Sequence, residues 1–259
     1  KVLDSLIAAA PRWAAVDQID RGPDGEVPRV NLSVKITSLY SLIDPIDWEG
    51  SIRAVKDRLR PIFSRARAAG AFVNVDMEQY RFKDLTYAIF RSLLDEPGLE
   101  DASAGIVVQA YLKDSEDDLL ELIEWSGARS RPITIRLVKG AYWDSEITWA
   151  KQKGWPIPVF LEKTETDANY ERLTRLLLES YDVVDAAFGS HNIRSLAHSI
   201  VTAEKLGMPK YGYEIQMLYG MGEPIRRGII RNGQRVRVNL PVGSLLPGMA
   251  SLIRRRMET

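Results

Sequence analysis

Short apolar runs alternate along the chain with longer segments in which apolar residues recur at helical spacing. Most of the runs are apolar enough to be buried on both faces, as the strands of a parallel sheet are. The pattern predicts seven strands, at residues 30–36, 72–76, 105–110, 133–138, 186–190, 211–217 and 235–240.

The segments between these runs are predicted to be helices. Residues 47–70 place Val55, Leu59 and Ile62 on one apolar stripe, and Gly70 follows as a stop signal. Alternating strands and helices form right-handed βαβ units around a parallel sheet, and no Pro-, Gly- or Ser-rich linker interrupts them. The sequence therefore predicts an α/β protein with a single (β/α)₈ TIM-type barrel. A doubly wound open sheet is the alternative.

The composition excludes several classes of partner and of catalytic site. The 259 residues carry 35 Lys and Arg and 35 Asp and Glu, so no overall field attracts nucleic acid or an anionic membrane. Cysteine is absent, which excludes disulfides, thiolate metal sites and a cysteine nucleophile. No apolar run approaches the roughly 20 residues of a membrane-spanning helix. The first residues do not resemble a signal peptide and read as the end of a helix.

Polar residues follow every predicted strand, at the end where a barrel gathers its functional groups. Gln109 and Arg136 are the most informative, because each lies inside an apolar strand. An unpaired polar group there would cost about 1–3 kcal/mol or more. The polar residues at the strand ends are Lys35, Asp76, Glu78, Gln109, Tyr111, Arg136, Lys139, His191, Asn192, Gln216 and Asn239.

The common catalytic and metal-binding signatures are missing. His191 and His198 are the only histidines and lack an HxxxH or Cys partner, so a zinc site is not expected. Asp76 and Glu78 could bind a hard cation but have no third carboxylate, and we predict no metal. The segment 219–224, "YGMGEP", lacks the third glycine of a dinucleotide fingerprint.

A surplus of cations indicates an anionic ligand instead. These cations are Lys35, Arg136, Lys139, Arg254 and Arg255. An arginine fork matches carboxylate and phosphate geometry. Gly140 allows the backbone to approach a ligand, and Trp143 offers a flat surface for a ring. Glu258 stands four residues after Arg254, so a helix would place them together. A flavin nucleotide fits these requirements.

Several motifs resemble those of proline dehydrogenases, most closely the proline dehydrogenase domain of bifunctional bacterial proline utilisation flavoenzymes. The resemblance runs from about Val30 onward and covers nearly the whole chain. The motifs, in order, are "SVKI", "NVD", "QAY", "LVKGAYWDSE", "SHN", "QMLYGMGEP", "PVG" and "LIRRRME".

The resemblance implies a distorted (β/α)₈ barrel that binds FAD non-covalently and oxidises L-proline to Δ1-pyrroline-5-carboxylate. It also implies electron transfer to a membrane quinone, a cytoplasmic location peripheral to the membrane, and a fused or partner aldehyde dehydrogenase. The lysine strand would be the second in that family, so this chain lacks the first. We expect one domain, with a helix end and loop at 1–29, the barrel at 30–243 and a substrate-binding helix over the barrel mouth at 244–259.

The family motifs also imply roles for individual residues. Lys35, Arg254 and Arg255 would hold the proline carboxylate, with Asp76 orienting these cations. Arg136 would lie beside the flavin N5 and stabilise the charge that develops there. Tyr142 and Leu218 would enclose the proline ring. The residues expected around the cofactor are Gln109, Arg136, Lys139, Gly140, Ala141, Trp143, Lys163, Thr166, His191, Asn192, Gln216, Leu218 and Glu258.

One position departs from the family pattern. Two residues before "PVG", where the family usually has a tyrosine over the substrate, this chain has Asn239. This change puts the substrate preference in question and suggests tolerance of hydroxyproline. Two other functions stay open from the residues alone. One is a Schiff-base lyase that uses Lys35 or Lys139, and the other is a flavin-binding module without activity.

Overall fold

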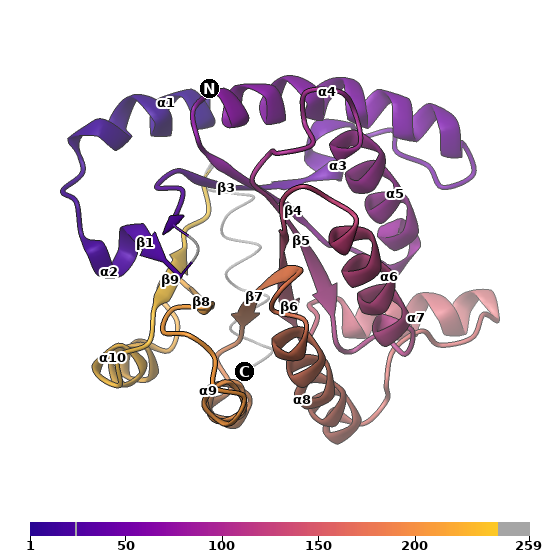
Figure 1. Cartoon of the computed structure of the whole chain (residues 1–259). Coiled ribbons are helices and arrows are strands. Elements are labelled where there is room, and N and C mark those ends of the chain that lie inside the picture. The colour runs from indigo at the N-terminus through magenta and orange to yellow at the C-terminus, as the bar shows by residue number, and fades with distance from the viewer. Residues whose placement is uncertain (24, 243–259) are drawn as a thin grey trace.

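The computed structural model describes residues 1–23 and 25–242, and its centre is a seven-stranded parallel sheet (Figure 1). The strands are β3 (Asn31–Lys35), β4 (Phe72–Asp76), β5 (Ala104–Gln109), β6 (Ile133–Val138), β7 (Val184–Gly189), β8 (Tyr213–Leu218) and β9 (Val236–Asn239). They neighbour one another in sequence order from β3 to β9. In a doubly wound sheet, the strand order would reverse at one point in the sheet. The predicted seven strands and the barrel-type fold are confirmed.

Helices cover the convex side of the curved sheet (Figure 1). They are α3 (Ile36–Leu39), α4 (Trp48–Ala68), α5 (Lys83–Leu94), α6 (Ser115–Gly127), α7 (Trp143–Lys153), α8 (Lys163–Glu179), α9 (Ile193–Lys205) and α10 (Glu223–Arg231), with a short 3₁₀ turn at Tyr80–Phe82. In α4, the side chain of Asp47 accepts a hydrogen bond from the Gly50 amide at the first turn. Gly70, with φ of +62°, follows its end.

The two faces of the sheet differ in polarity. Outward-facing residues such as Val75, Ile106 and Ile135 are fully buried in one core with the surrounding helices. The alternate residues face the concave side, and several are polar. Gly105 illustrates the crowding there, since a Cβ on it would lie 2.8 Å from the Asn74 side-chain oxygen. Most of the central strands are buried on both faces, as predicted, and the polar residues among them lie on the inner face.

The residues before β3 lie along the outside and at one end of this sheet. The start of α1 (Val2–Ala9) meets the C-terminal end of α4, where Asp4 pairs with Arg65 at 3.1 Å, and α1 runs on from there away from α4 (Figure 1). A 3₁₀ turn (Ala10–Arg12), α2 (Asp17–Asp20) and a hairpin of β1 (Arg21–Gly22) with β2 (Gly25–Glu26) follow. Within the described residues β3 and β9 are the free edges of the sheet.

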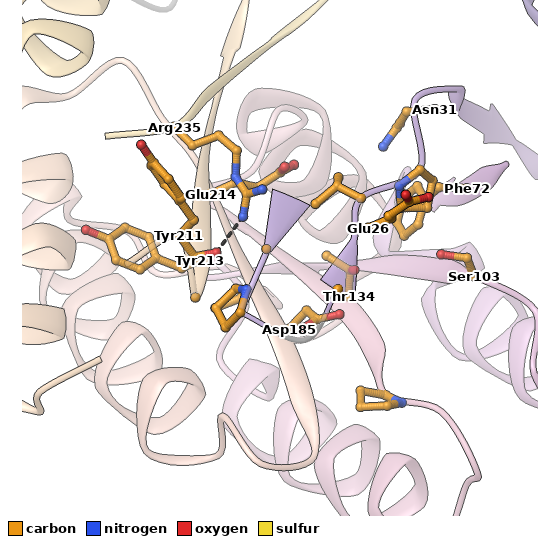
Figure 2. Close-up of a pocket in the computed structure, with 18 of the residues that line it drawn as sticks. Glu26, Asn31, Phe72, Ser103, Thr134, Asp185, Tyr211, Tyr213, Glu214 and Arg235 are labelled. Atoms are coloured by element: carbon orange, nitrogen blue, oxygen red, sulfur yellow. Dashed lines mark hydrogen bonds between the residues drawn. The ribbon is translucent and has the colours of Figure 1, made fainter. Parts of the chain in front are cut away.

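A cavity of about 450 Å³ opens at the amino ends of the strands, next to the hairpin (Figure 2). Its walls include Glu26, Asp185, Glu214 and Arg235. Arg235 donates to the backbone oxygens of Tyr211 and Arg21, which ties the hairpin to the sheet. In barrel enzymes this end serves stability, and the chemistry occurs at the carboxyl ends.

Candidate active site

Arg136 connects three strands across the inner face. From β6 it donates through one terminal nitrogen to the Asp76 carboxylate on β4 at 2.7 Å, and through the other to the Ser33 hydroxyl on β3 at 3.1 Å. The residue is 8% exposed. Asn74 donates to the same Asp76 oxygen at 3.0 Å. Arg136 is thus a buried, oriented cation inside the barrel, and Asp76 pairs with it instead of with the expected Lys35.

Lys35 ends β3 and reaches the far side of the site. Its ammonium group donates to the Tyr142 hydroxyl at 3.3 Å, which brings together two residues that were expected around the substrate. The chain after Lys35 is fixed by Glu78, which accepts from the Thr37 amide and hydroxyl. Since Glu78 is 6% exposed, this contact holds the end of β3 rigidly against the end of β4.

Two buried polar atoms near these residues make no hydrogen bond within the described part of the chain. One is the side-chain oxygen of Gln109, whose amide nitrogen donates to the Glu78 backbone oxygen at 3.3 Å. The other is Nε of Arg136. A buried acceptor and a buried donor without protein partners are costly, which indicates a ligand with complementary groups.

A cluster of charges follows β6. Lys139 forms a close ion pair with Asp167, and Lys163 reaches the second oxygen of the same carboxylate at 2.8 Å. Burial raises the pKa of Asp167, but its hydrogen bonds with the two lysines outweigh that and lower the pKa below its ordinary value. Asp167 was not predicted. Its spacing of four residues from Lys163 in α8 is the signal that could have revealed it.

Gly140 and Trp143 shape the loop between β6 and α7. Gly140 has φ of +134°, and a Cβ on it would lie 2.4 Å from the Tyr111 ring. The glycine therefore allows Tyr111 to pack closely, a reason that the sequence did not reveal. Trp143 donates to the Phe160 backbone oxygen at 2.8 Å and remains 41% exposed. Its ring is held in place with open surface. Ala141 is half-buried in the same loop.

The ends of β7 and β8 are joined by His191. The Leu218 amide donates to Nε2 of His191 at 3.0 Å, so that nitrogen is an acceptor. Asn192 caps α9, because its side-chain oxygen accepts from the Ser195 amide at 3.1 Å. Thr166 is buried within α8. Helix capping is thus a structural role for Asn192, next to the cofactor role implied by the family.

Gln216 and Asn239 meet at the ends of β8 and β9. The Asn239 amide nitrogen donates to the Gln216 side-chain oxygen at 3.1 Å, and Gln216 donates to Glu214 at 2.5 Å. Glu214 is paired with Arg237. Neither of these two charged residues was predicted, although each lies two positions before a predicted one on the same strand face.

Most of the predicted residues within the described ranges lie at or just after the carboxyl ends of β3 to β9, and Trp143, Lys163 and Thr166 lie on α7 and α8. Lys35 contacts Tyr142, Arg136 contacts Asp76, and the two pairs are neighbours because Lys35 and Asp76 lie opposite each other in the register of β3 and β4. His191, Leu218, Gln216 and Asn239 form a second group. Arg254, Arg255 and Glu258, with the helix expected at 244–259, lie outside the described residues.

A curved parallel sheet with an oriented internal cation, and with donors and exposed rings at its carboxyl end, defines the (β/α) barrel class, in which this end of the sheet is the candidate site for an anionic ligand. The sequence model of the family described as proline dehydrogenase matches residues 2–259. The chain belongs to the proline dehydrogenase family. The prediction of this family is confirmed.

Relatives and solved structures agree with this assignment. The bifunctional protein PutA of Escherichia coli (strain K12) is 31% identical over 238 residues, which is 88% of this chain and 18% of that protein. The proline dehydrogenase of Deinococcus radiodurans is 33% identical over 184 residues, 71% of this chain and 53% of that protein. The chain thus spans about a fifth of the length of the PutA relatives.

The crystal structure of proline utilization A from Bdellovibrio bacteriovorus, inactivated by N-propargylglycine, is similar over 98% of this chain and 27% of that one. The TM-score is 0.95 and the sequence identity 49%. In the described part of this chain, no helix combines the length and apolar character needed to cross a membrane.

Proposed function

We propose that this chain oxidises L-proline to Δ1-pyrroline-5-carboxylate with non-covalently bound FAD. The observation that carries the proposal is the oriented Arg136 guanidinium, which is fixed by Asp76 and Ser33 inside a barrel of the proline dehydrogenase family. When bound, FAD would supply the acceptor for the hydride that leaves the substrate's C5.

The buried residues fit a flavin. The ring edge of a flavin has an N–H donor between two carbonyl acceptors, and Gln109 offers an acceptor while Arg136 offers a donor without a protein partner in the described residues. Lys139 and Lys163 would hold the phosphates, with Asp167 keeping both ammonium groups in place. Trp143 would provide a ring surface on the adenosine side. Gln216, Leu218, His191 and Asn192 would complete the cofactor site.

The substrate would be oriented by its carboxylate. Lys35 would bind it together with Arg254 and Arg255, and Tyr142, which contacts Lys35, would enclose the ring with Leu218. Arg136 would stabilise charge that develops during the transfer, since its position needs no rearrangement. Orientation then contributes much of the catalysis, and no side-chain nucleophile is required.

A Schiff-base lyase is less well supported. That chemistry needs a desolvated, uncharged lysine. Lys139 is engaged in an ion pair with Asp167, and Lys35 contacts the Tyr142 hydroxyl. A flavin-binding module without activity would not explain the contact of Lys35 with Tyr142 or the buried, oriented guanidinium of Arg136.

The PutA relatives bear the description bifunctional and are several times longer than this chain. We therefore propose that the chain works beside a fused or partner pyrroline-5-carboxylate dehydrogenase. Following the family resemblance, we propose a membrane quinone as the electron acceptor and a cytoplasmic location at the membrane surface. The division into a barrel and a C-terminal substrate-binding helix at 244–259 is part of the same proposal.

The cofactor is expected to be FAD that acid precipitation releases into the supernatant. The reason is that the proposed site binds through hydrogen bonds and ion pairs, and the chain has no cysteine for covalent attachment. Absorbance of the supernatant and pellet after precipitation of FAD-supplemented protein measures this. Flavin that remains in the pellet, or protein that binds none, would refute the assignment.

Asn239→Tyr is expected to raise the ratio of kcat/KM for L-proline over trans-4-hydroxy-L-proline by about tenfold, equivalent to about 1.4 kcal/mol of transition-state binding. A tyrosine ring would pack against unsubstituted proline and leave less room for a 4-hydroxyl, while Asn239 supplies a polar partner. Steady-state kinetics with both substrates give the ratio. A flat or falling ratio would place Asn239 away from the substrate.

A further inference from the structure

An ion pair lies inside the barrel, two residues before Gln216 on β8 and two residues before Asn239 on β9. Arg237 on β9 and Glu214 on β8 form a two-pronged contact, with Nε–Oε1 at 2.8 Å and a terminal nitrogen to Oε2 at 2.9 Å. Their side chains are 23% and 13% exposed. Burial acts to raise the pKa of Glu214, but the charge and hydrogen bonds of Arg237 outweigh it and the pKa is lowered. Glu214 is therefore an ionised group that only accepts hydrogen bonds.

This carboxylate fixes which way the Gln216 amide points. The amide of Gln216 lies 2.5 Å from the Glu214 oxygen, and only its NH₂ group can donate to an ionised carboxylate. The carbonyl oxygen of Gln216 must then face the other way. Since Gln216 is 3% exposed and holds a charged partner, reversing its amide would place two acceptors together at high cost.

The orientation of the Gln216 amide fixes that of the Asn239 amide in turn. The group that faces the Gln216 oxygen at 3.1 Å has to be the NH₂ of Asn239. The Asn239 carbonyl oxygen is consequently turned away from Gln216, and no described residue donates to it. Glu214 and Arg237 also line the cavity at the amino ends of the strands (Figure 2 shows Glu214 at that cavity). The orientation of the two amides is therefore set from the end of the barrel opposite the candidate site.

We propose that Glu214, held by Arg237, acts through Gln216 as a positioning residue that makes Asn239 a hydrogen-bond acceptor towards the substrate. The inference rests on the proposed function, because it takes Asn239 to face the substrate ring. It predicts selection for a ring substituent that donates, such as a hydroxyl, over one that only accepts, such as a ketone. The size of the substituent has little part in this selection.

The test compares the dissociation constants of trans-4-hydroxy-L-proline and 4-oxo-L-proline by calorimetry, on FAD-loaded protein whose flavin is kept reduced so that neither ligand is oxidised. The parent is expected to bind the hydroxyl ligand about tenfold more tightly. In Glu214→Leu, the acceptor that orients the Gln216 amide is gone, so neither amide is held in its present orientation. The preference should then fall by about tenfold or more.

A second variant and a control distinguish this relay, the chain of hydrogen bonds from Glu214 through Gln216 to Asn239, from a general loss of stability. Gln216→Met breaks the relay while keeping the Arg237–Glu214 pair, and it should also abolish the preference. Glu223→Gln removes a carboxylate that pairs with Arg226 and Arg227 at the surface, and the preference should remain. A parent-like preference in either Glu214→Leu or Gln216→Met, with L-proline still oxidised, would overturn the proposed action of Glu214 through Gln216 and leave the proposed function standing. A parent that fails to oxidise L-proline would overturn the proposed function.

Discussion

Arg136→Met is expected to lower kcat/KM for L-proline by about a hundredfold to a thousandfold, the loss seen when one preorganised donor is removed from a buried reaction site. Arg136 is 8% exposed and is fixed by Asp76 at 2.7 Å and Ser33 at 3.1 Å, so its charge needs no reorganisation when the substrate reacts. Water cannot replace a donor held in this way. Steady-state kinetics per mole of bound flavin measure the effect.

Arg129→Met is the matched control. Arg129 is also buried, with 6% of its side chain exposed, but it donates to the backbone oxygens of Leu94 and Glu100 outside the barrel interior. Both variants should lose stability, since each removes contacts made by a buried cation, and only Arg136→Met should lose most of its activity. If both variants keep the parent's kcat/KM, Arg136 is a structural tie between strands and has no role in the chemistry.

Lys83→Met is expected to lower the free energy of unfolding by about 3–5 kcal/mol at neutral pH, the cost of breaking a buried ion pair. The Lys83 side chain is 5% exposed and lies 2.6 Å from Asp118 and 2.9 Å from Asp114. Removing it leaves these two carboxylates, and that of the exposed Asp84 at 3.2 Å, without their shared cation. This cluster joins α5 to α6 behind β4 and β5, which carry Asp76 and Gln109. Urea titration measures the change.

The loss should shrink in acid. Burial raises the pKa of Asp118 to about 6, above its ordinary value of 3.8, even with Lys83 present. When the pKa of a carboxyl is higher in the folded than in the unfolded protein, the folded state binds the proton more tightly. The free energy of unfolding therefore rises as the pH falls through that range. Without Lys83 this proton is held more tightly still. The deficit relative to the parent should be smaller at about pH 5 than at about pH 8.

Arg175→Met serves as the exposed comparison, since Arg175 pairs with Glu179 within α8 and its side chain is 68% exposed. Its loss should stay below about 0.5 kcal/mol at both pH values. A Lys83→Met deficit as small as this, or one that grows in acid, would contradict the account of the buried cluster.

Much of the fold could be predicted because parallel strands are short, apolar and separated by amphipathic helices, as in residues 47–70 before β4. The candidate site was also partly visible. Gln109 and Arg136 stood out as polar residues in apolar strands, and both point into the barrel with a buried atom that has no partner in the described residues.

What the sequence could not provide is the register between strands. The Arg237–Glu214 pair depends on Gln216 lying opposite Arg237, and the Arg136 contacts with Asp76 and Ser33 depend on the curvature of four strands. Neither can be read from local patterns, because register and curvature arise from packing among distant segments. The packing of Tyr111 against Gly140 has the same origin.

The most direct test of the central claim is the absorbance spectrum of the FAD-supplemented chain, recorded without oxygen before and after addition of L-proline. Oxidation of proline requires that its two electrons reduce the bound flavin. The account predicts that the flavin band bleaches and that the product is Δ1-pyrroline-5-carboxylate. A bound flavin whose band is unchanged by excess L-proline would contradict it.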